Sequence, residues 1–139
     1  MAGASDYTKA NILSALLRGV ALPLPAGTYI SLHTADPAGT GANEVTLANW
    51  PGYLRRKAEG AGAIGSGWGA PSGGVSSNSL QLTYPSNNGA AAVTVTHFAI
   101  WDALTTGNAL DSAALTTART LSIGDILVFD IGSLTVTVS

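Results

Sequence analysis

The sequence predicts an all-β domain, a jelly-roll-like antiparallel β-sandwich with a short N-terminal α-helix. The strongest strand signal covers residues 93–102, which are rich in β-branched and aromatic side chains and contain no glycine or proline. Seven or eight short strand patterns are separated by turn residues at nearly regular spacing, and strands do not alternate with helices. These observations favour a sandwich over a parallel sheet.

The 93–102 strand should lie at the centre of two layers. Strict alternation places five residues on one face, namely Val93, Val95, His97, Ala99 and Trp101. The other face carries Thr94 and Thr96 and then becomes apolar at Phe98 and Ile100. We therefore expect one half-exposed end and one end that is covered on both faces.

Composition indicates one domain over residues 1–139 and excludes several functions. Charged residues make up 10% of the chain, against about 25% in average soluble domains, and the net charge is −2 with six Lys and Arg. A nucleic-acid partner is therefore not expected. There is no cysteine, no signal peptide pattern and no apolar run long enough for a membrane span. A surface with so few charges favours self-association, and we expect a homo-oligomer, a dimer or trimer.

The only predicted helix covers residues 5–18. Ser5 or Asp6 can cap its start, Arg18 suits its negative end, and Gly19 suits the position after it. An apolar stripe results from the i,i+4 pairs Ile12 with Leu16 and Leu13 with Leu17. We expect this stripe to plug one end of the sandwich; docking on a neighbouring subunit is the alternative.

Further strands are predicted from alternation and flanking turns. They cover residues 28–33, 53–58, 80–84, 109–115, 126–131 and 134–138. Asn88-Gly89 is a hairpin signal, so the 80–84 strand is expected to pair with the 93–102 strand. Residues 60–74 hold many glycines and are predicted to form a loop, tied down by Trp68.

No residue pattern predicts a catalytic, cofactor-binding or metal site. The G-x-G-x-x-G letters at residues 60–65 run into Ser, Gly and Pro rather than a helix, so a dinucleotide site is not expected. His33 and His97 lie in strands without a triad pattern and are expected to be structural, bonded to a backbone carbonyl or a Thr hydroxyl. Asp36, Asn43 and Glu44 lack the ligand spacing of a calcium loop, and Asp36 is expected to cap a turn.

A partner interface is predicted from apolar, aromatic and basic residues. The basic run of Arg55, Arg56 and Lys57 could contact an acidic partner or could guard a sheet edge, and both readings stay open. The candidate interface residues are Ile12, Leu16, Trp50, Arg55, Arg56, Lys57 and Trp68. Tyr53, Trp50 and Trp68, near the Gly-rich loops, are the aromatic residues that would contact a glycan or protein ligand.

Several runs resemble a family of small tailed-bacteriophage structural proteins. The first block is Y-I-S-L-H-T-A-D-P at residues 29–37, with G-A-N-E-V at 41–45 and Y-L-R at 53–55. The second is T-H-F-A-I-W-D-A at 96–103 with T-G-N-A-L at 106–110, and the last is G-D at 124–125 with L-T-V-T at 134–137. Residues 46–52 and 60–74 depart from the pattern, which leaves the partner-specific surface undefined.

The resemblance implies a virion component that is not an enzyme. Members are commonly labelled tail fibre proteins and are also found as capsid cement or decoration subunits. The absence of a shaft, repeat or coiled coil favours a cement protein on the capsid exterior, bound to the major capsid protein. The alternative is a tail fibre or tail-tip protein that binds a host surface receptor. A small hydrolase or lectin-like domain is disfavoured because no nucleophile–base pair can be assembled.

Overall fold

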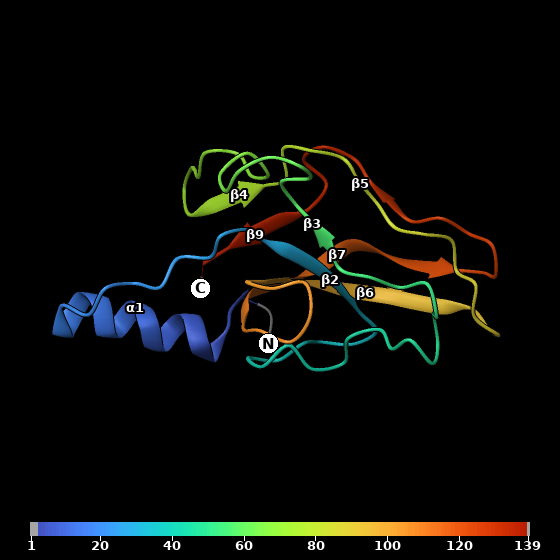
Figure 1. Ribbon diagram of the computed structural model, residues 1–139, viewed down its shortest axis with the longest axis horizontal. Helices are drawn as coiled ribbons and strands as arrows, with labels where there is room; N and C mark the ends of the chain where they lie inside the picture. The colour runs from blue at the N-terminus through green and yellow to red at the C-terminus, as the bar shows by residue number, and fades with distance from the viewer. Residues whose placement is uncertain (1–2, 139) are drawn as a thin grey trace.

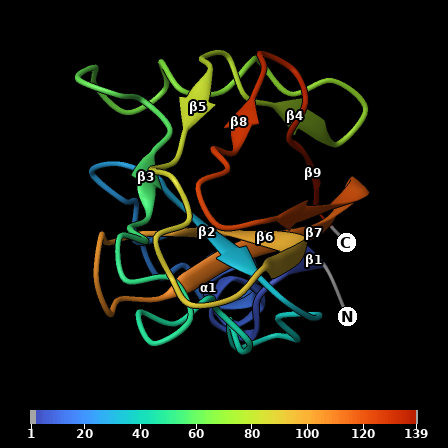
Figure 2. The same ribbon diagram turned by 90° about the vertical axis from the view of Figure 1, so that its right-hand side faces the viewer.

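A computed structural model describes residues 3–138 and shows an antiparallel β-sandwich with one helix. The five-stranded sheet has the order β1-β7-β6-β2-β3, and the pairs β4-β9 and β5-β8 form a second layer over it (Figures 1 and 2). The elements are β1 Gly3–Ala4, α1 Asp6–Arg18, β2 Tyr29–His33, β3 Arg56–Lys57, β4 Val75–Ser77, β5 Leu82–Thr83, β6 Val93–Trp101, β7 Ala109–Leu121, β8 Val128–Phe129 and β9 Thr135–Thr137. The predicted all-β class and N-terminal helix are confirmed.

The core fills the space between the two layers. Ile30, Leu32 and Phe98 from the large sheet meet Phe129 and Leu134 from the second layer, and all five are at most 3% exposed. Burial of such side chains is the main term that stabilises the sandwich, because each contributes about 1.5–3 kcal/mol. Within residues 3–138, no helix is both long enough and apolar enough to cross a membrane.

The central strand β6 is present as predicted, but its side chains are not distributed over the two faces of the sheet as predicted. The register between β6 and β7 shifts between the pairs Val95–Arg119 and His97–Ala114, where β6 advances by two residues and β7 by five, and Val95 and Phe98 enter the same core cluster although three positions separate them. Ala99 and Trp101 consequently face the opposite side of the sheet, in a second small cluster. Strict alternation was therefore wrong, because the irregular pairing between Val95 and His97 changes which face of the sheet the following side chains of β6 occupy.

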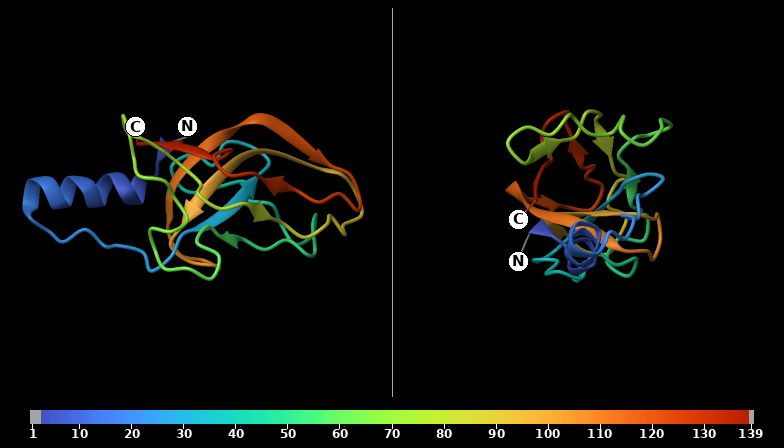
Figure 3. Two further views of the ribbon diagram at one scale, coloured as in Figure 1. Left: turned by 90° about the horizontal axis from the view of Figure 1, so that it is seen from above. Right: turned by 90° about the vertical axis from the view of Figure 1, so that its left-hand side faces the viewer.

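The helix α1 forms where it was predicted. The Ser5 hydroxyl accepts a hydrogen bond from the Thr8 N–H at 3.1 Å, and Gly19 ends the helix in the left-handed region at φ 67°. No residue of α1 is buried, and the helix projects from one end of the sandwich before residues 19–28 return to β2 (Figures 1 and 3). The expectation that α1 plugs the sandwich is wrong. We call residues 6–27 the arm and the other described residues the body.

The predicted hairpin between the 80–84 and 93–102 strands does not form. Strand β5 pairs with β8 instead, with Leu82 opposite Phe129. The reason lies in Asn87, which is fully buried and donates from its side chain to the carbonyls of Ala91 and Leu121 at 3.0 and 2.9 Å. The Asn-Gly segment is thus anchored to the body and leads the chain from one layer to the other, not back along the same sheet.

Buried side chains join segments that short strands alone would hold weakly. Asn78 donates to the carbonyls of Leu80 and Asp130 and accepts from the Leu134 N–H at 2.9 Å. The Tyr84 hydroxyl donates to the Ile30 carbonyl at 2.8 Å and so links the two layers. Of the nine strands formed by residues 3–138, four contain only two residues, and such cross-links compensate for their short ladders.

The predicted loop at residues 60–74 contains turns and bridges but no helix, and the dinucleotide motif inside it opens no helix either. The Trp68 indole N–H donates to the Thr28 hydroxyl at 2.9 Å, and the half-buried ring packs on the core. Thr28 in turn donates to the buried Glu59 carboxylate at 2.6 Å. The predicted attachment of this loop by Trp68 is confirmed.

Candidate functional site

Arg55 is an internal clamp, not a surface cation. It is 8% exposed, and its guanidinium bonds the Glu44 carboxylate at 2.9 and 2.7 Å. The same group donates to the carbonyls of Ala103 and Thr106 and lies 3.7 Å from the ring centroid of Trp101. All these interactions are made within the chain, so the prediction that Arg55 contacts a partner directly is corrected.

The Tyr53 hydroxyl extends this cluster into the core. It donates to Glu44 at 2.8 Å and accepts from the Leu32 N–H at 3.0 Å. Burial would raise the pKa of Glu44, but the hydrogen bonds from Arg55 and Tyr53 outweigh it and hold the pKa below its usual value. Glu44 is therefore ionised and already paired, which makes it a poor ligand for calcium.

Arg56 and Lys57 lie at an edge. Strand β3 pairs only with β2 and ends the five-stranded sheet. Lys57 donates to the Gly62 carbonyl at 3.2 Å, whereas the buried Nε of Arg56 has no hydrogen-bond partner. A basic cluster that protects a sheet edge from wrong pairing must lie on an edge strand, as Arg56 and Lys57 do. Their contact with an acidic partner stays a prediction.

Two of the three aromatic residues proposed for ligand contact are buried. Trp50 is 0% exposed and donates to the Ser86 carbonyl at 3.0 Å, and its ring centroid lies 5.7 Å from that of Tyr53, which is 7% exposed. Neither ring can stack on a sugar or a partner without unfolding of the body. Trp68 is half-buried and holds the Gly-rich loop, as described above.

His33 belongs to a buried chain of hydrogen bonds. Its Nδ1 lies 2.7 Å from the Ala42 carbonyl and its Nε2 lies 2.6 Å from the Ser31 hydroxyl, which accepts from the Trp101 indole at 2.7 Å. Burial lowers the pKa of His33, so the neutral ring donates from Nδ1 and accepts at Nε2. Ser31 and His33 are both 0% exposed, and no substrate can reach this pair in the folded body.

The remaining candidate residues, His97 and Asp36, have the structural roles that were predicted for them. His97 bonds the Thr96 hydroxyl at 2.8 Å, so the predicted bonding of both histidines is confirmed. Asp36 accepts from the Ala38 N–H at 2.8 Å and caps the turn as predicted, while the Asn43 side chain donates to the Asp36 carbonyl. Among the described residues, no three His, Asp or Glu side chains come close enough to hold a metal ion.

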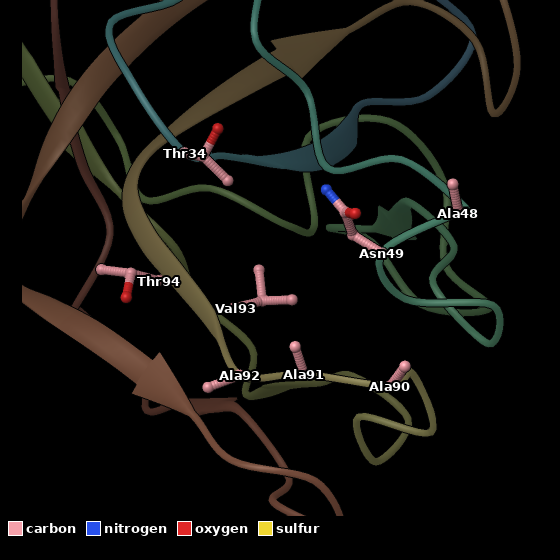
Figure 4. A pocket seen from close by; sticks show the side chains of 8 residues that line it. All are labelled: Thr34, Ala48, Asn49, Ala90, Ala91, Ala92, Val93 and Thr94. Atoms are coloured by element: carbon pink, nitrogen blue, oxygen red, sulfur yellow. The ribbon is translucent and has the colours of Figure 1, made fainter.

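The body carries a shallow hollow of about 360 Å³ beside the start of β6. Figure 4 shows the Asn49 side chain directed toward its interior, with small side chains on the opposite wall. It has no charged lining residue; those present are Thr34, Ala48, Asn49, Ala90, Ala91, Ala92, Val93 and Thr94. A neutral polar group of a partner would fit such a lining better than an ion.

The most exposed apolar surface lies on the arm. Leu16 and Leu17 are each 77% exposed and Leu13 is 56% exposed, although Ile12 is half-buried. The return segment adds Leu24, which is 81% exposed. The predicted stripe thus exists, but it faces solvent. Of the seven candidate interface residues, Ile12 and Leu16 lie on the arm, while the other five lie in the body and are buried or half-buried.

The runs that resemble phage proteins converge on one network. Glu44, Tyr53 and Arg55 come from the first block and Trp101 from the second, and they are all joined by the contacts given above. Asp102 of the second block accepts from the Asn108 N–H at 2.7 Å and closes the next loop. These motif residues therefore specify the fold, and exposed residues that were not among the interface candidates, such as Leu17 and Leu24, lie elsewhere.

Comparison with protein families decides the origin of the chain. The model of the family described as podophage GP4 fiber I protein gp80 matches residues 3–137. The chain belongs to this family. It is therefore a bacteriophage structural protein of a fibre family, in agreement with the resemblance, whereas the specific cement role is not part of what the match shows. A comparison with curated proteins found no match.

Proposed function

We propose that this protein is a subunit of a tail fibre and takes part in attachment of the virion to the host surface. The observation that carries the proposal is the match over residues 3–137 to a family described by a podophage fibre protein. The match covers both the body and the arm. It favours the tail alternative over the capsid cement role that the sequence alone suggested.

The architecture supports a division of labour in such a fibre. The arm projects from one end of the body and exposes leucines, so it suits attachment to another protein subunit (Figure 3). The body is cross-linked internally, and its surface carries the uncharged hollow of Figure 4 as well as exposed apolar side chains such as Leu47 and Ile131. A rigid body held by an apolar arm is suited to presenting a receptor-binding surface.

Labelling of intact virions with an antibody against the body tests this proposal directly. We expect gold particles at the tail in electron micrographs. Particles that lack the protein should keep their DNA on heating but should adsorb to host cells at least about tenfold more slowly. Labels confined to the head, together with normal adsorption, would contradict the tail assignment.

Capsid cement is the second candidate, because no shaft or long coiled coil occurs within residues 3–138. In that role the protein would bind the major capsid protein on the outside of the shell, and many weak contacts would add through effective concentration. Particles without it would then release DNA at a lower temperature. Head labelling combined with this loss of heat resistance would favour cement over fibre.

We further propose that the protein binds but does not catalyse. Support comes from Ser31 and His33, a serine–histidine contact that is completely enclosed. Incubation of the purified protein with host surface glycans should release no reducing sugar. Turnover that is lost in Ser31→Ala and kept in Ser66→Ala, a substitution in the exposed Gly-rich loop, would refute this proposal.

A further inference from the structure

A hollow of about 300 Å³, which we call the Arg119 hollow, lies between β7 and the second layer of the sandwich. Its lining includes the buried ring of Phe129 and the exposed side chains of Thr116, Thr117 and Thr135. Within residues 3–138, none of these three threonine hydroxyls has a hydrogen-bond partner. They can therefore bond a ligand in place of water.

Arg119 is the only charged residue that lines this hollow in the described part of the chain. Its side chain is exposed, and among residues 3–138 its guanidinium forms neither an ion pair nor a hydrogen bond. Arg55, by contrast, uses its nitrogens on Glu44 and on two carbonyls. A guanidinium with all its donors unused is suited to a bidentate contact with a planar anion such as a carboxylate.

The backbone of β7 is irregular where it borders the Arg119 hollow. Between Ala114 and Arg119, β7 advances by five residues while β6 advances by two. Residues 115–118 therefore have no partner in the β6 ladder, and Thr116 and Thr117 among them line the hollow. Irregularities of this kind redirect side chains and are common beside binding sites.

We propose that the Arg119 hollow binds an acidic sugar of the uronic acid class. Arg119 holds the carboxylate, the threonine hydroxyls bond the hydroxyls of the ring, and the carbon face of the ring packs toward Phe129. The volume is at the lower end of the range for ligand sites, about 300–1,000 Å³, and suits one sugar unit. That the sugar belongs to the host surface rests on the attachment function proposed above; the binding itself does not.

The balance of charge selects a carboxylate over a phosphate. A phosphate monoester carries a charge of about −1.5 to −2 at pH 7, whereas Arg119 supplies one positive charge. Asp125 lines the adjoining hollow on Arg119, and its carboxylate accepts from the Ser122 N–H at 2.9 Å. Asp130, next to Phe129 in the chain, accepts from the Gln81 side chain at 3.0 Å. These two negative charges disfavour a doubly charged ligand.

Titration of the full-length protein with sodium glucuronate, followed by amide NMR shifts, tests the site. We expect shifts at residues 115–119 and 132–135 and a dissociation constant of about 1–10 mM. Glucose lacks the carboxylate and should bind at least about tenfold more weakly. Equal binding of glucose, shifts confined to other residues, or no shift at about 50 mM glucuronate would overturn the proposal. Tighter binding of glucose 6-phosphate would overturn the choice of a carboxylate.

Substitutions test whether Arg119 carries the binding. Arg119→Gln should raise the dissociation constant for glucuronate at least about tenfold, and Arg119→Lys should raise it about threefold because an ammonium cannot form the bidentate contact. Thr117→Val, which leaves the cation in place, should raise it about threefold. All three positions are exposed, so the thermal transition should not change. Arg18→Gln, at an exposed arginine of the arm, is the matched control and should bind normally. Unchanged binding by Arg119→Gln would overturn the assignment.

Failure of this inference is distinguishable from failure of the attachment function. If the purified protein binds glucuronate through Arg119 but antibody labels only the head of the virion, the sugar site stands and the tail function is wrong. If antibody labels the tail but glucuronate does not bind, the tail function stands and the sugar site is wrong.

Discussion

The leucines of the core and the leucines of the arm have opposite environments in this protein. Leu32 and Leu134 are 0% exposed, whereas Leu16 and Leu17 are each 77% exposed. The body obtains its stability from enclosed apolar contacts and from buried hydrogen bonds between distant segments. The arm makes few such contacts, and its leucines are exposed. Buried and exposed apolar side chains are therefore concentrated in separate parts of one short chain.

A matched pair of leucine substitutions should give the largest difference in stability between the core and the arm. Leu32→Ala leaves a cavity at the centre of the core and should lower the free energy of unfolding by about 2–5 kcal/mol. Leu16→Ala should change it by less than about 0.5 kcal/mol. Urea denaturation of both variants, each at a concentration where the protein is monomeric, measures the difference. Equal losses would show that the arm is part of the cooperative core.

Arginine substitutions give the next largest contrast. Arg55→Met removes the partner of Glu44 and the donors to two loop carbonyls, and it should cost about 3 kcal/mol. Arg18→Met on the arm should cost less than about 0.5 kcal/mol. Thermal denaturation followed by near-ultraviolet circular dichroism measures both. If Arg55→Met were as stable as the wild type, the cluster around Trp101 would not stabilise the body.

Two glycines with positive φ sharpen the comparison further. A side chain at Gly41 would collide with the Trp101 ring, whereas the space around Gly19 is open. Gly41→Ala should therefore cost about 2–3 kcal/mol, from backbone strain plus displacement of the ring. Gly19→Ala should cost about 1 kcal/mol, from strain alone. Calorimetric melting temperatures would show the order, and a larger loss at Gly19 would contradict it.

The smallest effect concerns Asp111 of β7. Burial raises the pKa of Asp111 to about 6. The folded state therefore binds the proton more tightly than the unfolded state, and the ionised carboxylate costs stability above pH 6. After allowance for its partial exposure, Asp111→Asn should stabilise the body by about 1 kcal/mol at pH 7. The gain should shrink as the pH falls from 6 to 4; a gain that is independent of pH would exclude this cause.

Much of the fold could be predicted from the sequence because local signals coincide with the observed elements. The Ser5 cap and Gly19 define the helix, and the residues of β2 and β6 alternate or are β-branched as strands require. The errors arose where tertiary contacts decide. The register shift between β6 and β7 and the hydrogen bond from Asn87 to the Leu121 carbonyl depend on neighbours that are remote in the sequence.

The candidate site was less predictable than the fold. Arg55 looks like a surface charge in the sequence, and only the structure shows Glu44 and Trp101 enclosing it. Trp50 likewise carries no local sign of burial. The apolar stripe of the helix was recognisable, but periodicity cannot say whether the partner of a stripe lies in the same chain or in another one.

Hydrogen bonds from single side chains hold the segments of the second layer together, and this has a mechanical consequence. Strands β4, β5, β8 and β9 are two or three residues long, and Asn78, Tyr84 and Asn87 carry much of the bonding between the segments around them. A force applied to a virion during adsorption or DNA release is then shared among separate hydrogen-bonded contacts instead of one long strand ladder. We therefore expect the second layer to open in several separate events under load, because no single long ladder joins its segments.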